Sequence, residues 1–202
     1  MKHFIYIVLL VAACSVQAAQ VSKDYLKANR YNIKGQIAGE IFPDPDKHND
    51  GLVFPATRYT YNSNGQLSNT QTGYLSAWQN ETIAPKDWTG FTVQSQVIIG
   101  YDGYGRKIRE TQAKSDGTAL QITQYSYDTS DRLKCQAVRM NTSTFGSLSS
   151  NACSLVSSSE GMTDRITQYE YDSKNRIKTI KKAVGTTVTQ SYARYTYDQF
   201  WQ

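Results

Sequence analysis

Histidine, cysteine and proline are scarce in this chain of 202 residues, and their scarcity argues against several kinds of active site. The chain contains two histidines, three cysteines and four prolines. His3 lies in an N-terminal segment that we expect to be removed, so His48 alone remains for acid–base chemistry. A Ser-His-Asp arrangement would depend on that one residue, and zinc, phosphate-loop and dinucleotide signatures are absent from the sequence. We therefore expect a protein that is not an enzyme and holds no cofactor.

Long runs of basic or of apolar residues are also few. No run of Lys or Arg exceeds two residues, and the formal net charge is +5. A nucleic-acid-binding protein usually shows a basic patch or stripe, so we expect no nucleic-acid partner. The one sustained apolar run, Phe4–Ala13, is too short to cross a membrane as a helix.

The N-terminus has the features of an export signal. A short positive start precedes the apolar run, and small or tolerated residues stand at the two positions before a cleavage site after Ala18. These features predict a signal peptide of residues 1–18 and a mature chain of residues 19–202. The alternative is a lipoprotein in which Cys14 becomes the lipidated first residue. Either route predicts a secreted or cell-surface protein.

Tyrosine is abundant, at fifteen residues, and ten of the tyrosines belong to a repeated pattern. The pattern is Tyr, then Asp or Asn, two variable residues, a turn residue, a basic or polar residue and an aliphatic residue. Six copies start near Tyr31, Tyr61, Tyr101, Tyr127, Tyr171 and Tyr197. Two segments, 73–90 and 135–161, are insertions that lengthen the units containing them.

Each copy of the pattern predicts a β-hairpin. A second tyrosine often lies two residues before the first, which places both rings on one face of a strand. The Asp or Asn accepts hydrogen bonds from the backbone just after it and starts a turn. The fifth residue must then adopt a positive φ, and its occupants tolerate that conformation: Gly35, Gly65, Gly105, Asp131 and Asn175. The sequence predicts an all-β protein, one unit of repeated hairpins that forms a curved strip.

The motif Tyr-Asp-x-x-Gly-Arg-aliphatic, with a Tyr-x-Tyr-Asp strand, resembles the YD repeat of the bacterial RHS family. That family is related to repeats in Tc toxin shells and in teneurins. The resemblance covers residues 29–198, and its motif positions are Tyr31, Gly35, Tyr61, Gly65, Tyr101, Asp102, Gly105, Arg106, Tyr127, Asp128, Arg132, Tyr171, Asp172, Arg176, Tyr197 and Asp198. It implies a strip of hairpins that spirals into a hollow β-shell, often around a toxin domain. This chain would be a partial shell, a scaffold completed by further RHS repeats or a partner chain.

Two further sets of residues are candidate sites. Cys135 and Cys153 are an even pair in an oxidising compartment, so we predict that they form a disulfide. Asp46, His48 and Asp50 alternate as the ligands of a calcium loop do, although a histidine nitrogen would be an unusual calcium ligand. We favour a solvated acidic turn there, with calcium as the alternative.

Arginine recurs at one position of the hairpin, in Arg106, Arg132 and Arg176. Such a row would either bind a ligand as a line of positive charges, or lie over tyrosine rings and bond to the turn Asp of a neighbouring repeat. We favour the second interpretation. Trp78 and Trp88 lie outside the motif. They support an alternative function, a module that binds cell-surface carbohydrate through exposed indole rings.

The sixth copy of the motif is not completed in this sequence, which stops shortly after Tyr197 and Asp198. A strand without its hairpin partner presents unpaired backbone groups that pair readily with other chains. We therefore expect this chain to self-associate until further repeats or a partner chain cover that edge.

Overall fold

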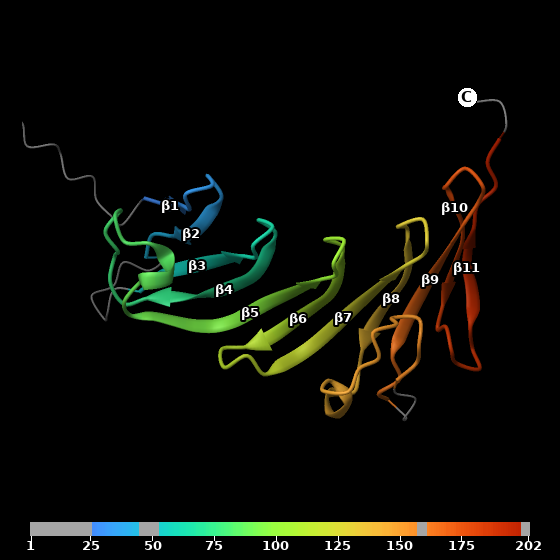
Figure 1. Cartoon of the computed structure of the whole chain (residues 1–202). Helices are drawn as coiled ribbons and strands as arrows, with labels where there is room; N and C mark the ends of the chain where they lie inside the picture. Colours follow the sequence, from blue (N-terminus) through green and yellow to red (C-terminus); the bar gives the residue numbers. More distant parts are fainter. Residues whose placement is uncertain (1–25, 45–52, 157–160, 199–202) are drawn as a thin grey trace, which may run out of the picture.

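The computed structural model describes residues 26–44, 53–156 and 161–198. Within these residues, eleven antiparallel strands form one sheet in sequence order (Figure 1). The strands are β1 (Ala28–Tyr31), β2 (Ile37–Ile41), β3 (Phe54–Tyr61), β4 (Leu67–Leu75), β5 (Phe91–Tyr101), β6 (Lys107–Lys114), β7 (Ala119–Tyr127), β8 (Leu133–Arg139), β9 (Arg165–Tyr171), β10 (Ile177–Lys182) and β11 (Gln190–Arg194). Two short 3-10 helices, η2 (Pro85–Asp87) and η3 (Thr142–Thr144), lie in the long connections.

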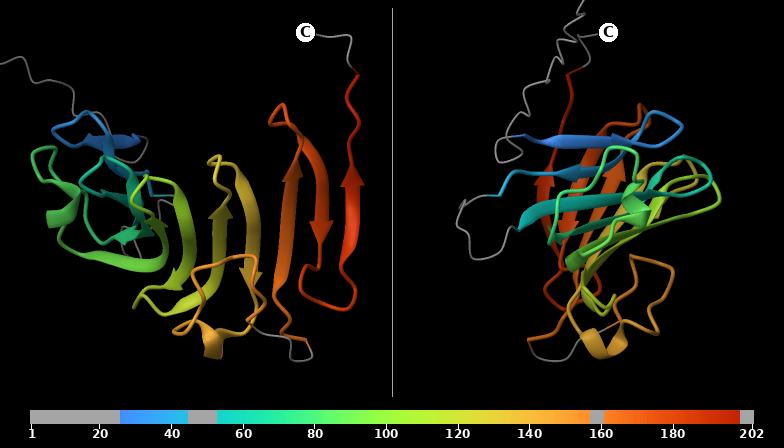
Figure 2. Two further views of the ribbon diagram at one scale, coloured as in Figure 1. Left: turned by 45° about the vertical axis from the view of Figure 1, so that its right-hand side comes forward. Right: turned by 90° about the vertical axis from the view of Figure 1, so that its left-hand side faces the viewer.

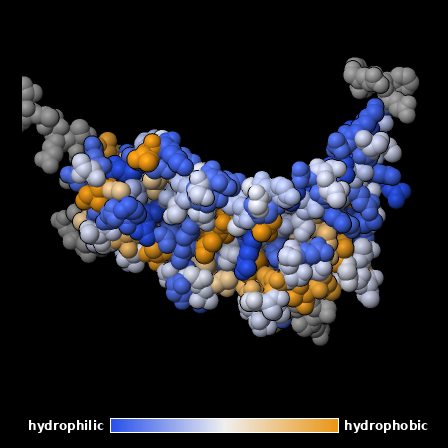
Figure 3. All heavy atoms as spheres, viewed as in Figure 1, coloured by the Kyte–Doolittle hydropathy of each residue, from blue (hydrophilic) through white to orange (hydrophobic). Residues whose placement is uncertain are grey.

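The sheet is open and bends into a curved strip. Figure 2 shows β1 and β11 at opposite ends, and Figure 3 shows the concave upper outline of the whole molecule. The prediction of an all-β curved strip is confirmed. None of the helices in the described ranges combines the length and the apolar character needed to cross a membrane.

The repeated pattern forms the hairpin turns at one edge of the strip. In the turn between β5 and β6, the Asp102 amide donates to the Arg106 carbonyl at 3.0 Å, and the Asp102 Oδ1 accepts from the amides of Tyr104 and Arg106. The register then shifts by a bulge at Tyr101. The fifth residues have φ of 75°, 79°, 78°, 60° and 63° at Gly35, Gly65, Gly105, Asp131 and Asn175. The predicted positive φ is confirmed at all five turns.

These φ values predict different responses to substitution at two turns. Gly105→Val should lower the free energy of unfolding by more than about 1 kcal/mol, because a β-branched residue is strained at positive φ. Its Cβ would also lie 3.3 Å from the Gln66 amide nitrogen. Asn175→Gly should change stability by less than about 0.5 kcal/mol, since backbone relief offsets the loss of an exposed hydrogen bond. Urea unfolding measures both; equal effects would contradict the assigned turn geometry.

Both long connections pack on the same face of the sheet. Residues paired directly across an antiparallel ladder share a face, and the pairs Gly39↔Arg58, Arg58↔Gln71 and Gln71↔Gln96 belong to one such row. The segment 76–90 covers this row at the β2 end, where a Cβ on Gly39 would meet the Trp88 ring at 2.6 Å. We call this side of the sheet the covered face.

Two clusters of buried side chains lie beneath the connections. The first joins five residues from β2, β3, β4 and the following connection: Ile41, Phe54, Ala56, Leu75 and Trp88. The second joins β8 and β9 to the segment after β8: Cys135, Ala137, Ala152 and Ile166. A disulfide joins Cys135 to Cys153, the pair that the sequence predicts. The core therefore lies on the covered face, and the other face carries half-buried tyrosines such as Tyr59 and Tyr125.

A buried ion pair fixes the second connection to the sheet. Arg139 at the end of β8 and Asp164 just before β9 both have fully buried side chains, with 2.7 Å between the Arg139 Nη1 and the Asp164 Oδ2. The guanidinium also donates to the Gln124 side chain at 2.7 Å and to the carbonyl of Ser154 at 2.8 Å. The Asp164 carboxylate accepts from the amide of Val156 at 3.0 Å. Sheet and connection thus share one buried network.

Candidate functional site

The most developed side-chain arrangement is a ladder of contacts along the turn edge of the strip. At its centre, the Arg132 Nε donates to the Asp128 Oδ2 of its own turn at 2.8 Å. The Arg132 Nη1 donates to the Asn175 side chain, in the next turn, at 2.7 Å. The guanidinium carbon lies 4.6 Å from the centre of the Tyr171 ring, also in the next repeat. One arginine therefore joins two repeats by a hydrogen bond and a cation–π contact.

Arg106 occupies the same position one repeat earlier and makes the equivalent contacts. It forms ion pairs with Asp102 at 2.7 Å and with Asp131 at 2.5 Å, and its guanidinium lies 4.7 Å from the centre of the Tyr127 ring. The interpretation that these arginines lie over tyrosine rings is confirmed, whereas their bond to the first turn Asp of a neighbouring repeat needs a correction. The turn Asp belongs to the arginine's own repeat, where the bulge brings the two side chains together, and the neighbour contributes its fifth residue.

Arg176 makes the equivalent contacts at the last turn that is described. Its Nε lies 2.8 Å from the Asp172 Oδ2, and its guanidinium lies 4.1 Å from the centre of the Tyr197 ring. Its place in the repeat would direct it toward a following turn, whose fifth residue lies outside the described residues.

Glutamine replaces arginine in the first two repeats and keeps the link between turns. The Gln36 amide nitrogen donates to the Gly65 carbonyl at 2.7 Å, and the Gln66 amide nitrogen donates to the Gly105 carbonyl at 2.7 Å. The neutral amide reaches the backbone where the arginines reach a side-chain oxygen. Sequence reasoning missed this role, although the signal was present, because glutamine stands at the arginine position of the motif.

The motif tyrosines link the same repeats through their hydroxyl groups. Each hydroxyl donates to the backbone carbonyl at the start of the outgoing strand one repeat earlier. The five bonds are Tyr61 to Ile37 at 2.7 Å, Tyr101 to Leu67 at 2.8 Å, Tyr127 to Lys107 at 2.8 Å, Tyr171 to Leu133 at 2.8 Å and Tyr197 to Ile177 at 2.7 Å. The tyrosines thus fix the spacing of successive hairpins.

Hydrogen bonds and burial shift the pKa values of acidic and phenolic groups in the ladder and beside it. The side-chain hydrogen bond from Arg132 is the largest influence that holds the pKa of Asp128 below its usual value. Burial and a 2.6 Å hydrogen bond to Glu40 raise the pKa of Tyr59 to about 12. At physiological pH the carboxylates are therefore charged and the Tyr59 hydroxyl remains a donor. The three motif arginines each form an ion pair with a carboxylate of the same chain.

The tyrosine hydroxyls allow a direct test of the ladder. Tyr171→Phe should lower the free energy of unfolding by about 1 kcal/mol, because it removes one hydrogen bond and leaves the Leu133 carbonyl without this donor. Tyr104→Phe is the matched control, since Tyr104 is 85% exposed and lies in a turn. Chemical unfolding of both variants gives the comparison. Equal stability of the two would contradict a structural role for the hydroxyl.

The structure changes the status of the two tryptophans. Trp88 is only 6% exposed and packs edge-on against Phe91, 6.0 Å between ring centres. It therefore cannot stack on a sugar, and our expectation of an exposed Trp88 ring is wrong, because segment 76–90 folds back onto the sheet. Trp78 is half-buried and packs edge-on against Phe54, with ring centres 5.5 Å apart. The two rings do not form a joint platform for a ligand.

Several predicted features lie outside the described residues. The signal peptide, the lipidation alternative at Cys14, and the candidate calcium ligands Asp46, His48 and Asp50 belong to this group. Among the residues that are described, no group of three or more His, Cys, Asp or Glu side chains has the arrangement of a metal site.

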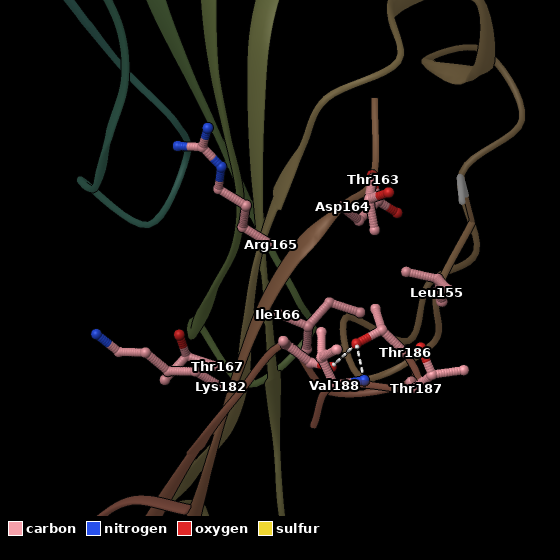
Figure 4. A pocket seen from close by; sticks show the side chains of 12 residues that line it. Leu155, Thr163, Asp164, Arg165, Ile166, Thr167, Lys182, Thr186, Thr187 and Val188 are labelled. Atoms are coloured by element: carbon pink, nitrogen blue, oxygen red, sulfur yellow. Dashed lines mark hydrogen bonds between the residues drawn. The ribbon is translucent and has the colours of Figure 1, made fainter. Parts of the chain in front are cut away.

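A surface cavity of about 830 Å³ opens beside β9 and the segment before β11 (Figure 4). Figure 4 shows Thr186 and Val188 on one side, while the charged ends of Arg165 and Lys182 point away from them. Asp164 is the one acidic residue among those that line the cavity, and its carboxylate binds Arg139. The cavity brings together no acid, base and nucleophile in the manner of a catalytic site.

Comparison with known proteins gives a distant likeness only. No protein-family model and no curated protein matches the chain. It is similar to a chain in the solved "Crystal Structure of TcdB2-TccC3", with 16% identity and a TM-score of 0.34, over 85% of this chain and 10% of that one. The form "without hypervariable C-terminal region" matches with 17% identity and a TM-score of 0.32 over the same shares. The chain thus spans about a tenth of the solved chains that it matches.

Proposed function

We propose that this chain is an exported, non-enzymatic scaffold, a segment of a β-shell wall that further repeats or a partner chain continue. The observation that carries the proposal is the use of the motif side chains. The Tyr hydroxyls and the Arg and Gln side chains contact the next or previous repeat, and the turn carboxylates hold the arginines of their own repeat in place. Because the motif side chains make contacts between repeats, they support an architectural role for the chain.

The ends of the ladder support the idea that the strip is built to be extended. Tyr61, Tyr127 and Tyr171, inside the ladder, are half-buried. Tyr31 at the first described repeat is 58% exposed, and Tyr197 at the last is 40% exposed. A preceding hairpin would cover Tyr31 as Arg106 covers Tyr127, and a following strand would cover Tyr197. The proposed shell segment therefore offers both ends to neighbours of the same construction.

Completion of the sixth hairpin tests this proposal. A variant in which residues 199–202 are replaced by a copy of residues 173–182 would supply a turn and an outgoing strand after Asp198. We expect a higher urea midpoint and a larger m value, since the added strand buries more surface. A scrambled copy of the same ten residues is the control. Equal stability of the two extended chains would contradict the proposal that further repeats continue the sheet at this end.

A further inference from the structure

Arg58 on β3 is a half-buried cation without a carboxylate partner among the described residues. Its Nε and Nη2 donate to the Gln71 Oε1 at 3.1 and 2.6 Å. Its guanidinium carbon lies 4.5 Å from the centre of the Phe91 ring. The N–H groups along the outer edge of the guanidinium, on Nη1 and Nη2, have no acceptor within the described part of the chain.

Arg58 differs in this respect from the motif arginines. Arg106 pairs with two carboxylates, and its pKa is raised above the ordinary value chiefly by the hydrogen bond to Asp102. Burial lowers the pKa of Arg58, because no carboxylate replaces the water that the guanidinium has lost. The guanidinium is still charged at neutral pH. A partly desolvated positive charge therefore remains on the covered face of the sheet.

A cavity of about 600 Å³ opens at Arg58, between β3, the first hairpin turn and the start of η2. Arg58 and Lys86 are the cationic residues in its wall, and none of the residues that line it is acidic. Lys86 is paired with Asp87, so Arg58 supplies the uncompensated charge. Much of the remaining wall is apolar or aromatic: Tyr31, Ile33, Ala38, Ala84 and Pro85. Such a cavity suits a small molecule, because a few polar groups orient a ligand whose body lies against an apolar wall.

Two amide side chains hold the guanidinium in position. The Gln71 Nε2 donates to the Gln96 Oε1 at 3.1 Å, and the Gln96 Nε2 donates to the Ser115 carbonyl at 2.9 Å. Gln96 is buried, and these bonds fix the orientation of both amides, so that Gln71 presents its oxygen to Arg58. The charged edge is therefore ordered before a ligand arrives, which lowers the conformational cost of binding.

The unused edge of Arg58 matches a carboxylate. Its outer nitrogens present parallel N–H groups, and both oxygens of a carboxylate can accept from them at once. We propose that this cavity binds a small-molecule carboxylate with an apolar or aromatic body. The carboxylate pairs with Arg58, and the body lies against the apolar wall. This binding function goes beyond the proposed scaffold and does not depend on whether further repeats continue the strip.

A charged ligand and its neutral analogue test the role of Arg58. In ligand-observed NMR titrations of the full chain, 3-phenylpropanoate should bind saturably. The amide 3-phenylpropanamide should bind at least about tenfold more weakly, because it cannot form the paired, charge-assisted bonds. Inorganic phosphate should compete at least about tenfold less well than unlabelled 3-phenylpropanoate, since phosphate has no body to cover the apolar wall.

Thr60 allows a carboxylate to be built into the protein as an internal competitor. It is exposed and lies two residues from Arg58 on the same face of β3. Thr60→Glu should place a carboxylate beside the guanidinium, whereas Thr60→Gln places a neutral side chain of the same length there. Binding of 3-phenylpropanoate should be about tenfold or more weaker in the glutamate variant than in the glutamine variant.

Removal of the charge gives an independent measurement. Arg58→Met should weaken 3-phenylpropanoate binding about tenfold or more and leave the weak binding of the amide unchanged, whereas a misfolded variant would lose both. Arg109→Met is the matched control. Arg109 is also half-buried on the covered face and donates to the Thr111 hydroxyl at 3.2 Å, but it does not line the cavity, so its replacement should change neither affinity.

Four results would each overturn the proposal. They are the absence of saturable binding to the wild type, equal affinity for the acid and the amide, displacement by an equal concentration of phosphate, and equal binding by Thr60→Glu and Thr60→Gln. None of these results bears on the sixth-hairpin test, so the failure of the binding site and the failure of the scaffold are distinguishable.

Discussion

Replacing Arg139 by methionine is expected to lower the free energy of unfolding by about 3–5 kcal/mol. The cost does not arise from the loss of favourable charge attraction alone. Moving two charges out of water costs solvation free energy. The attraction between the two buried charges, with their hydrogen bonds, offsets much of that cost. When the guanidinium is removed, the Asp164 carboxylate stays in a fully buried position without its counter-charge.

The surroundings of Arg139 give a second reason for a large effect. The Gln124 oxygen and the carbonyl of Ser154 accept from the guanidinium and would lose that donor. Buried acceptors without donors destabilise a fold by more than a typical hydrogen bond stabilises it. The methionine fills much of the volume of the arginine side chain. The loss of stability therefore measures the effect of the unpaired polar groups more than the effect of a cavity.

Urea unfolding of Arg139→Met beside Arg165→Met measures the effect. Arg165 is an exposed arginine on the adjacent β9, and its substitution should change stability by less than about 0.5 kcal/mol. The double variant Arg139→Met with Asp164→Leu should recover part of the loss, because it removes the uncompensated charge. A loss below about 1 kcal/mol in the single variant would show that the ion pair is not buried in solution.

The hairpins were predictable from the sequence because their causes are local. A turn of seven residues contains its own Asp or Asn, its own positive-φ residue and its own bulge. The residues that cause the turn are therefore the same ones that make up the sequence motif. Asp131 and Asn175 illustrate this, since the motif alone predicted their φ. The overall strip follows from stacking such units in sequence order.

The contacts made by the connections were not predictable in the same way. Trp88 is buried because a connection of fifteen residues folds back over Gly39, and nothing near Trp88 in the sequence encodes that path. The sequence around Arg139 gives a weak indication that this residue is buried. Cys135, Ala137 and Arg139 alternate on one face of β8, so an arginine follows two residues suited to burial. Its partner Asp164 lies beyond the connection, and only the three-dimensional structure joins them.

Removal of the Cys135–Cys153 disulfide is the other change for which we expect a large loss. The bond closes a loop with a sequence separation of 18 residues. On the chain-entropy model, freeing a loop of that length lowers stability by about 3 kcal/mol, since the unfolded chain regains its conformational freedom. The variant Cys135→Ala with Cys153→Ala should therefore unfold at a clearly lower urea concentration. The reduced wild type separates this effect from the cavity that alanine leaves at the fully buried Cys135.

The disulfide and the Arg139 network hold the same connection, so their losses should not add. Cys153 and Ser154 are adjacent, and the Ser154 carbonyl is an acceptor for Arg139. Once either anchor is lost, part of the connection is already free, and loss of the second anchor releases less structure. The triple variant, with both cysteines and Arg139 replaced, should lose at least about 0.5 kcal/mol less than the sum of the separate losses. A strictly additive result would show that the two anchors stabilise separate parts of the connection, and the shared buried network would then not act as one unit.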